Sequence, residues 1–126
     1  MEYGFVKVAA ATPEIKVADC QYNTDAVLAL WQQADALGCH LVTFPELVLT
    51  GYTCGDLFLQ PVLLQGCLQG LKNLISASTE LQSVAVVGAP IVHQGKLFNC
   101  AVVIQQGEVL GIVPKTSLPT YGEFYE

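Results

Sequence analysis

The sequence contains no arginine and few charged residues of any kind. Its 126 residues include five lysines and eleven acids, and only 13% of the chain is charged. A basic patch cannot be assembled from so few cations, so we expect no nucleic-acid partner. No apolar run reaches the roughly 18 residues that a membrane span needs, and no basic segment precedes an apolar one as in a signal peptide. We therefore expect no membrane span, and we expect a cytoplasmic protein.

Disulfide and metal-binding patterns are also missing. The cysteines are odd in number and never pair as CxxC; they are Cys20, Cys39, Cys54, Cys67 and Cys100. This pattern favours reduced thiols, and all except Cys54 fall on apolar faces and are expected in the core. The two histidines, His40 and His93, are far apart in sequence and have no further ligand at a typical spacing. No metal site is therefore predicted.

Apolar side chains, in contrast, are abundant and make up 52% of the residues. A compact monomer of this length has difficulty hiding so much apolar surface. The excess indicates a large interface between copies of the protein, or a chain that is part of something bigger. We expect both together, in a homo-oligomer.

The first part of the chain predicts a strand, a helix and a second strand. The strands are predicted at 6–10 and 39–44, with apolar residues at helical spacing between them. Asn23 and Thr24 are expected to cap the helix, and Gly38 to end it. A strand, helix and strand in this order imply a parallel pair of strands.

The later part predicts a second helix followed by three closely spaced strands. Pro61 can begin the helix, because its missing N–H costs nothing in the first turn. The strands are predicted at Val84–Gly88, Leu97–Ile104 and Val109–Val113, with hairpin turns at Gln94-Gly95 and Gln106-Gly107. Residues 114–126 show no clear periodicity. The predicted fold class is α/β, with a mixed sheet covered by two helices on one face.

One carboxylate, Glu46, stands within an apolar segment that opens into a glycine-containing loop, Phe44–Asp56. Apolar surroundings disfavour the charged form and raise the pKa of a carboxyl group, which suits a general base near neutral pH. Catalytic groups are also often found on loops that rigid elements hold. A structural interpretation stays open, because a glutamate after a proline can simply serve the first turn of a helix.

Lys115 follows the apolar segment Val109–Pro114. It could place a fixed cation at the edge of the sheet, where it would stabilise an oxyanion. It could equally mark the end of a strand. Glu123, further along the chain, could hold this lysine in place or be solvated.

Loop residues offer further candidates for chemistry. Cys54 could act as a nucleophile only with a base in reach and a lowered thiol pKa, so a packing role is favoured. Asp56 could cap a turn or short helix. Tyr52, Tyr121 and Tyr125 could line a pocket, although loop tyrosines commonly just pack.

Three blocks of the sequence resemble the nitrilase, or carbon-nitrogen hydrolase, superfamily. They are Val6–Ala10, Phe44–Leu47 and Pro114–Pro119. Segments Leu49–Phe58 and Leu118–Glu126 resemble one branch closely, the glutaminase domain of bacterial glutamine-dependent NAD synthetase. The resemblance spans essentially the whole chain. It implies part of an α-β-β-α sandwich, whose second sheet and neighbouring subunits would cover the excess apolar surface.

The resemblance also implies roles for individual residues. Glu46 would be the general base, and Lys115 the cation that stabilises the tetrahedral intermediate. Glu123 resembles a second glutamate near the lysine, and Tyr121 a tyrosine that shapes the glutamine pocket, with Tyr52 a further candidate for lining it. The nucleophilic cysteine of the family follows the lysine block, and none of the cysteines here occupies that position.

The implied reaction is hydrolysis of glutamine, whose ammonia would aminate nicotinate adenine dinucleotide in a synthetase domain that uses ATP and magnesium. Residues 1–126 would be the N-terminal part of the glutaminase domain, truncated before the nucleophile and inactive alone. The chain itself is expected to bind no cofactor, and its partners would be the rest of the glutaminase domain and the synthetase domain. Two alternatives stay open: a stand-alone amidase or carbamoylase, and a non-catalytic α/β interaction module.

Overall fold

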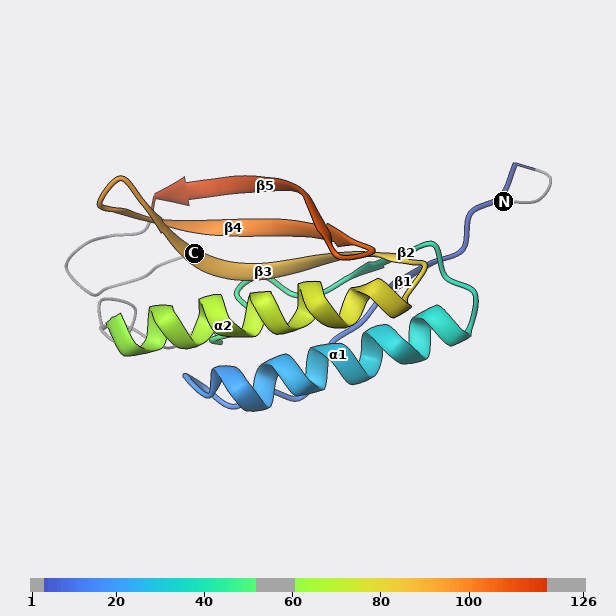
Figure 1. Ribbon diagram of the computed structural model, residues 1–126, viewed down its shortest axis with the longest axis horizontal. Coiled ribbons are helices and arrows are strands. Elements are labelled where there is room, and N and C mark those ends of the chain that lie inside the picture. Colours follow the sequence, from blue (N-terminus) through green and yellow to red (C-terminus); the bar gives the residue numbers. More distant parts are fainter. Residues whose placement is uncertain (1–3, 52–60, 118–126) are drawn as a thin grey trace.

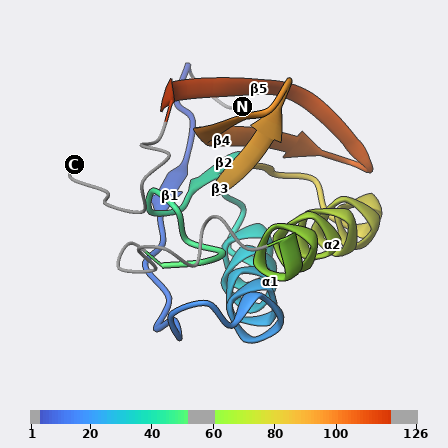
Figure 2. The same cartoon turned by 90° about the vertical axis from the view of Figure 1, so that its left-hand side faces the viewer.

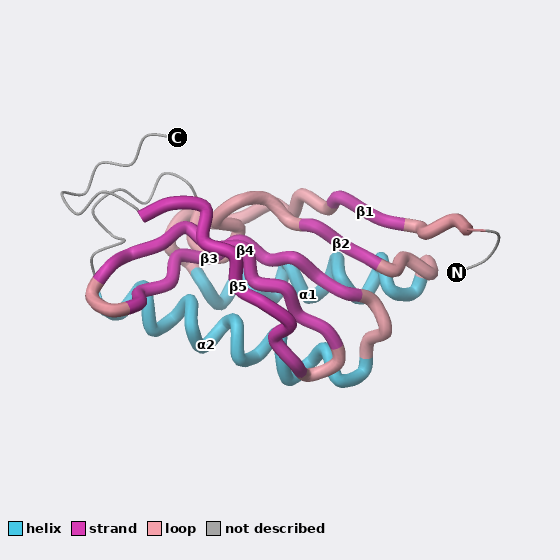
Figure 3. Tube along the Cα trace, turned by 90° about the horizontal axis from the view of Figure 1, so that it is seen from above, coloured by secondary structure: helices cyan, strands magenta, loops and turns pink. Residues whose placement is uncertain are grey.

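Five strands form one mixed sheet, and two long helices lie against one of its faces (Figures 1 and 2). The structure is a computed structural model that describes residues 4–51 and 61–117. The strands follow one another across the sheet in the order β1-β2-β3-β4-β5. Seen from above, they form a layer over both helices (Figure 3). The predicted α/β class, with a mixed sheet and two helices on one face, is confirmed.

The N-terminal half of the sheet is parallel. Strand β1 (Val8–Ala10) leads through helix α1 (Cys20–Ala36) to strand β2 (Leu41–Thr43). The two strands pair in parallel, and β2 pairs in parallel with β3 on its other side. Gly38 has a φ of +83°, the left-handed conformation that commonly ends a helix and that glycine adopts without strain. Its predicted role is confirmed.

The start of α1 differs from the prediction. The capping residue is Asp19, whose side chain accepts a hydrogen bond of 3.0 Å from the backbone N–H of Tyr22. Asn23 and Thr24 lie inside the helix and are buried, so their prediction as caps is wrong. The side chain of Asn23 instead bonds the backbone of Lys16 in the preceding loop, a contact that local sequence does not reveal.

Helix α2 (Pro61–Ala77) begins at the predicted proline and is followed by the short 3₁₀ helix η2 (Ser78–Glu80). One face of α2 turns inward, and its buried residues are Leu63, Cys67, Gly70, Leu71 and Leu74. Spacings of three and four residues put these side chains on a single stripe, as expected for a helix that covers a sheet. The helix therefore closes the core from below in Figure 1.

Three long antiparallel strands complete the sheet. They are β3 (Val84–His93), β4 (Lys96–Gln105) and β5 (Glu108–Ser117). The two hairpin turns have positive φ at both central residues, 51° and 76° at Gln94-Gly95 and 46° and 83° at Gln106-Gly107, as a type I′ turn requires. Strand β5 continues past its predicted end because pairing with β4 extends to Ser117.

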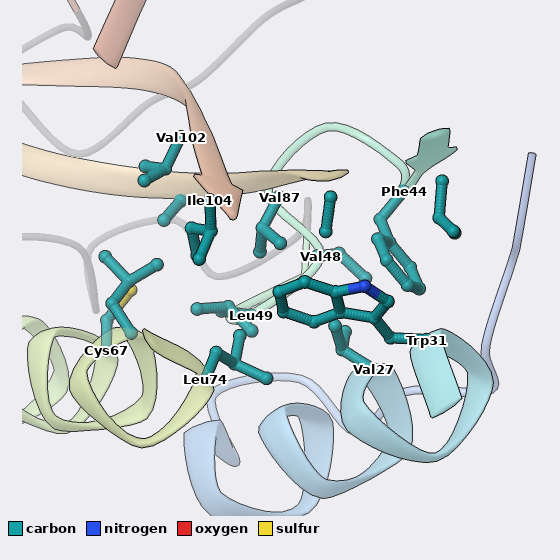
Figure 4. Close-up of a cluster of buried hydrophobic side chains, with 14 of the residues drawn as sticks. Val27, Trp31, Phe44, Val48, Leu49, Cys67, Leu74, Val87, Val102 and Ile104 are labelled. Atoms are coloured by element: carbon teal, nitrogen blue, oxygen red, sulfur yellow. The ribbon is translucent and has the colours of Figure 1, made fainter. Parts of the chain in front are cut away.

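The core lies between the sheet and the helices. Figure 4 shows the side chains of α1, α2, β3 and β4 that meet around Trp31, which is completely buried. Cys20, Cys39 and Cys67 belong to this cluster and Cys100 is buried as well, so their prediction as core residues is confirmed. Burial on this scale is the main source of stability for such a layer.

Apolar side chains also remain at the surface. On β1 and β5 they are 41% to 60% exposed; they are Val8, Val109, Leu110, Ile112 and Val113. No element of the described chain covers them, and exposed apolar side chains on edge strands commonly mark contact surfaces. This agrees with the excess apolar content of the sequence.

Candidate active site

The loop that follows β2 carries Glu46 and lies flat against β3. The N–H of Phe44 donates to the carbonyl oxygen of Val86 at 3.0 Å, and the N–H of Leu49 to that of Gly88 at 3.4 Å. Gly88 allows this approach, because a Cβ atom there would come within 2.7 Å of the Pro45 oxygen. The backbone of the loop is thus held directly on the sheet.

The opposite side of the loop is held by α1. Asn23 is fully buried, and its amide donates to the carbonyl oxygens of Lys16 at 2.7 Å and Leu49 at 3.0 Å. The N–H of Ala18 donates to the Thr50 oxygen at 2.8 Å. Bonds to both α1 and β3 therefore restrict the backbone on which Glu46 stands, as suits a group that must keep its geometry.

The carboxylate of Glu46 receives two donors on one oxygen. Lys115 Nζ lies 2.8 Å from Glu46 Oε1, and Asn99 Nδ2 lies 2.6 Å from the same atom. The Glu46 side chain is 28% exposed, that of Lys115 is 56% exposed, and Asn99 is 1% exposed. The ion pair between Glu46 and Lys115 is therefore accessible from solvent, whereas the amide of Asn99 that also contacts Glu46 is buried.

An irregularity in the sheet accounts for the position of Lys115. In the pairing of β4 with β5, Asn99 is opposite Thr116 and Cys100 is opposite Pro114. The register skips Lys115, which is the extra residue of a β-bulge. Bulges re-aim side chains and are frequent next to active sites. Lys115 consequently lies within β5 rather than beyond the end of a strand.

A concave site of about 380 Å³ surrounds the pair. It is lined by Phe44, Glu46, Val86, Gly88, Asn99, Cys100, Ala101, Val113 and Lys115. This combination of apolar walls and a few convergent polar groups is typical of sites for small molecules. A second groove of about 290 Å³ between α2 and β3 has no charged residue in its lining, so it offers no comparable chemistry.

The described cysteines do not supply an activated thiol at this site. Cys100 lines it, but burial raises the pKa of this thiol and so disfavours the thiolate that a nucleophile needs. The pKa of Cys20 is lowered, mainly by a hydrogen bond with Cys67. Cys20 and Cys67 are not among the residues that line the Glu46 site.

The predicted site residues are thus partly assembled. Glu46 and Lys115 meet although they are 69 positions apart. Tyr52, Cys54, Asp56, Tyr121, Glu123 and Tyr125 lie outside the described residues. The sequence did not predict a role for Asn99. Its signal was a single amide within an otherwise apolar predicted strand, since a buried polar side chain needs a partner.

Among residues 4–51 and 61–117 there is no group of three or more His, Cys, Asp or Glu side chains placed to hold a metal ion. His40 and His93 are both exposed, and His93 ends β3. None of the helices described is long and apolar enough to cross a membrane.

Comparison with known proteins identifies the family. Residues 7–126 match the model of the carbon-nitrogen hydrolase family, and the chain belongs to this family. It is 45% identical over 125 residues to the glutamine-dependent NAD(+) synthetase of Mycobacterium tuberculosis. That match covers 99% of this chain but 18% of the relative, so the chain spans less than a fifth of the length of that protein.

Solved structures confirm the fold. A glutamine-dependent NAD(+) synthetase from Cytophaga hutchinsonii superposes with a TM-score of 0.82 over 90% of this chain and 19% of its own, at 24% identity. An amidase from Nesterenkonia sp. superposes with a TM-score of 0.74 over 95% of this chain and 47% of its own, at 20% identity. Both have the layer of strands and helices described above.

Proposed function

We propose that this chain is the glutaminase portion of a glutamine-dependent NAD synthetase. The observation that carries the proposal is the contact of 2.8 Å between Lys115 Nζ and Glu46 Oε1 inside a concave site. The 45% identity to a protein of that name supports the choice of substrate. Residues 1–126 would be the N-terminal part of the glutaminase domain, with the nucleophilic cysteine outside them.

In the proposed reaction, a cysteine thiolate attacks the side-chain amide carbon of glutamine. Glu46 accepts the thiol proton and delivers it to the departing ammonia, while Lys115 stabilises the negative oxygen of the tetrahedral intermediate. Glu46 then takes a proton from water, which cleaves the thioester and releases glutamate. Glu123 would support Lys115, and Tyr121 and Tyr52 would shape the glutamine pocket.

The proposal assigns the remaining chemistry to other parts of the protein. Ammonia would pass to a synthetase domain that aminates nicotinate adenine dinucleotide with ATP and magnesium. We assign both ATP and magnesium to that domain. The exposed apolar side chains of the two edge strands, β1 and β5, would be covered by the rest of the glutaminase domain and by further subunits of a homo-oligomer in the cytoplasm.

The test uses the full-length protein that contains this chain. Ammonia release from glutamine and NAD formation driven by added ammonia are measured separately. Glu46→Gln should lower glutamine hydrolysis by about 10²- to 10⁴-fold, the usual contribution of a general base. NAD formation from added ammonia should stay unchanged. Glu108→Gln, at an exposed glutamate that begins β5, is the matched control and should behave as wild type.

The same assays separate the alternatives. Hydrolysis of other amides without NAD formation from ammonia would identify a stand-alone amidase of the kind that the Nesterenkonia structure represents. If both Glu46→Gln and a Lys115 variant hydrolysed glutamine at the wild-type rate, the proposed catalytic roles of Glu46 and Lys115 would be wrong. That outcome would favour a non-catalytic interaction module.

A further inference from the structure

We propose that Asn99 is a positioning residue that orients the Glu46 carboxylate for proton transfer. This inference rests on the proposed function, because it concerns the same general base. Asn99 Nδ2 lies 2.6 Å from Glu46 Oε1, and Asn99 is 1% exposed. Its amide is therefore a buried donor aimed at the reacting group from a strand 53 positions away in sequence.

The two donors of Glu46 come from neighbouring strands at one irregularity. Asn99 is on β4 beside the point where the register against β5 shifts, and Lys115 is the residue that the shift skips. The bulge thus delivers an amide and an ammonium group to the same carboxylate oxygen. Two donors on one oxygen restrict rotation of the carboxylate about its last bond.

The two donors respond differently to proton transfer. Once Glu46 becomes neutral, its ionic attraction to Lys115 is lost, and the ammonium group can turn toward a developing oxyanion. The Asn99 amide is neutral and bonds a carbonyl oxygen as well as a carboxylate oxygen. Asn99 therefore holds the carboxyl group in both protonation states, whereas Lys115 holds it in only one.

A purely structural role for Asn99 makes a different prediction. Burying an amide is unfavourable unless the amide is hydrogen-bonded, so Glu46 could serve merely as its partner. In that case, replacing Asn99 would change the stability of the protein and leave the chemical step unaffected. Only kinetic measurements on folded protein can separate this role from positioning.

The experiment compares Asn99→Ala and Asn99→Asp in the full-length protein. Values of kcat and KM for glutamine hydrolysis are measured as a function of pH, with NAD formation from added ammonia as the check that the protein is folded. Asn99→Ala should lower kcat by about 10- to 100-fold with little change in KM, because a misplaced base slows the chemical step. Asn73→Ala, at an exposed asparagine whose side chain contacts Gln69, is the matched control.

Asn99→Asp has nearly the same shape but places a second carboxyl group against Glu46. Two adjacent carboxylates resist simultaneous ionisation, so the acid limb of the kcat profile should move to higher pH in this variant and not in Asn99→Ala. If Asn99→Ala fails to fold, the pH profile of kcat for Asn99→Asp alone distinguishes positioning from a purely structural role. Unchanged kcat and an unchanged profile, or an effect confined to KM, would overturn the inference. The proposed function fails separately, if Glu46→Gln hydrolyses glutamine normally.

Discussion

Two carboxylates in this chain are held in contrasting ways. Asp35, near the end of α1, accepts the N–H groups of Gln82 and Ser83 at 2.9 and 2.8 Å and the Ser83 hydroxyl at 2.8 Å. The same hydroxyl accepts the indole N–H of Trp31 at 2.9 Å, which ties α1 to the start of β3. Glu46 instead meets an ammonium group within a concave site.

The difference separates a structural acid from a proposed general base. The partners of Asp35 are backbone and hydroxyl groups that favour its charged form. Burial acts against this charge, but the bonds from Ser83 and Gln82 outweigh it and lower the pKa of Asp35. An acid held in that way stays ionised and links elements of the fold. Glu46, in contrast, faces a half-exposed cation and space for a small molecule, as the proposed proton transfer requires.

The largest expected effect comes from removing the cation that contacts Glu46, the proposed general base. Lys115→Gln removes the cation at similar length and should lower glutamine hydrolysis by the full-length protein about 10²- to 10³-fold, the typical cost of losing an oxyanion donor. Stability to urea should change by less than about 1 kcal/mol, because exposed ion pairs contribute little. Lys96→Gln in the β3–β4 hairpin is the control. A loss of stability in step with the loss of rate would instead mean that the pair supports the fold.

Asp35→Ala should show the reverse pattern. It removes three hydrogen bonds to a charged acceptor, and we expect a loss of about 2 kcal/mol in unfolding free energy. Rates of glutamine hydrolysis at 25 °C should stay near wild type. Asp25→Ala is the matched control, because Asp25 lies on the same helix and its carboxylate accepts hydrogen bonds from the exposed Gln21 side chain.

The pH dependence of that loss follows from the direction of the pKa shift. A carboxyl group with a lower pKa in the folded protein stabilises it above the unfolded pKa of about 3.9. This contribution disappears as the pH falls through the folded pKa. The stability difference between wild type and Asp35→Ala should therefore be constant from about pH 7 to pH 5 and shrink below about pH 4. A difference that grows in acid would contradict the assignment.

The sequence predicted the parts of this arrangement that depend on local pattern. Helix α2 starts at Pro61, and both hairpin turns occur where glycine permits a positive φ. The cap of α1 and the full length of β5 were not predicted, because they depend on tertiary contacts and on pairing with β4. Asn99 was missed for the same reason, since its partner is far away in sequence.

The smallest expected effect concerns a buried hydroxyl that, unlike the carboxylates of Asp35 and Glu46, has no hydrogen-bond partner among the described residues. Thr24 is 2% exposed, and its hydroxyl has no hydrogen-bond partner within the part of the chain that the structure describes. It points at Gly70, where α1 and α2 are in contact and where any Cβ atom would collide with it. Thr24→Val removes the unpartnered hydroxyl at nearly constant shape.

We expect Thr24→Val to raise the unfolding free energy by up to about 1 kcal/mol, since an unsatisfied buried hydroxyl is costly. Urea unfolding of the full-length protein measures the change, and Gly70→Ala, which crowds the same contact, should lower stability instead. A loss in Thr24→Val larger than about 1 kcal/mol would mean that the α-hydrogen of Gly70 serves as a weak donor to the hydroxyl. The contact between the helices would then contain a partnered polar group, as the Asp35 and Glu46 clusters do.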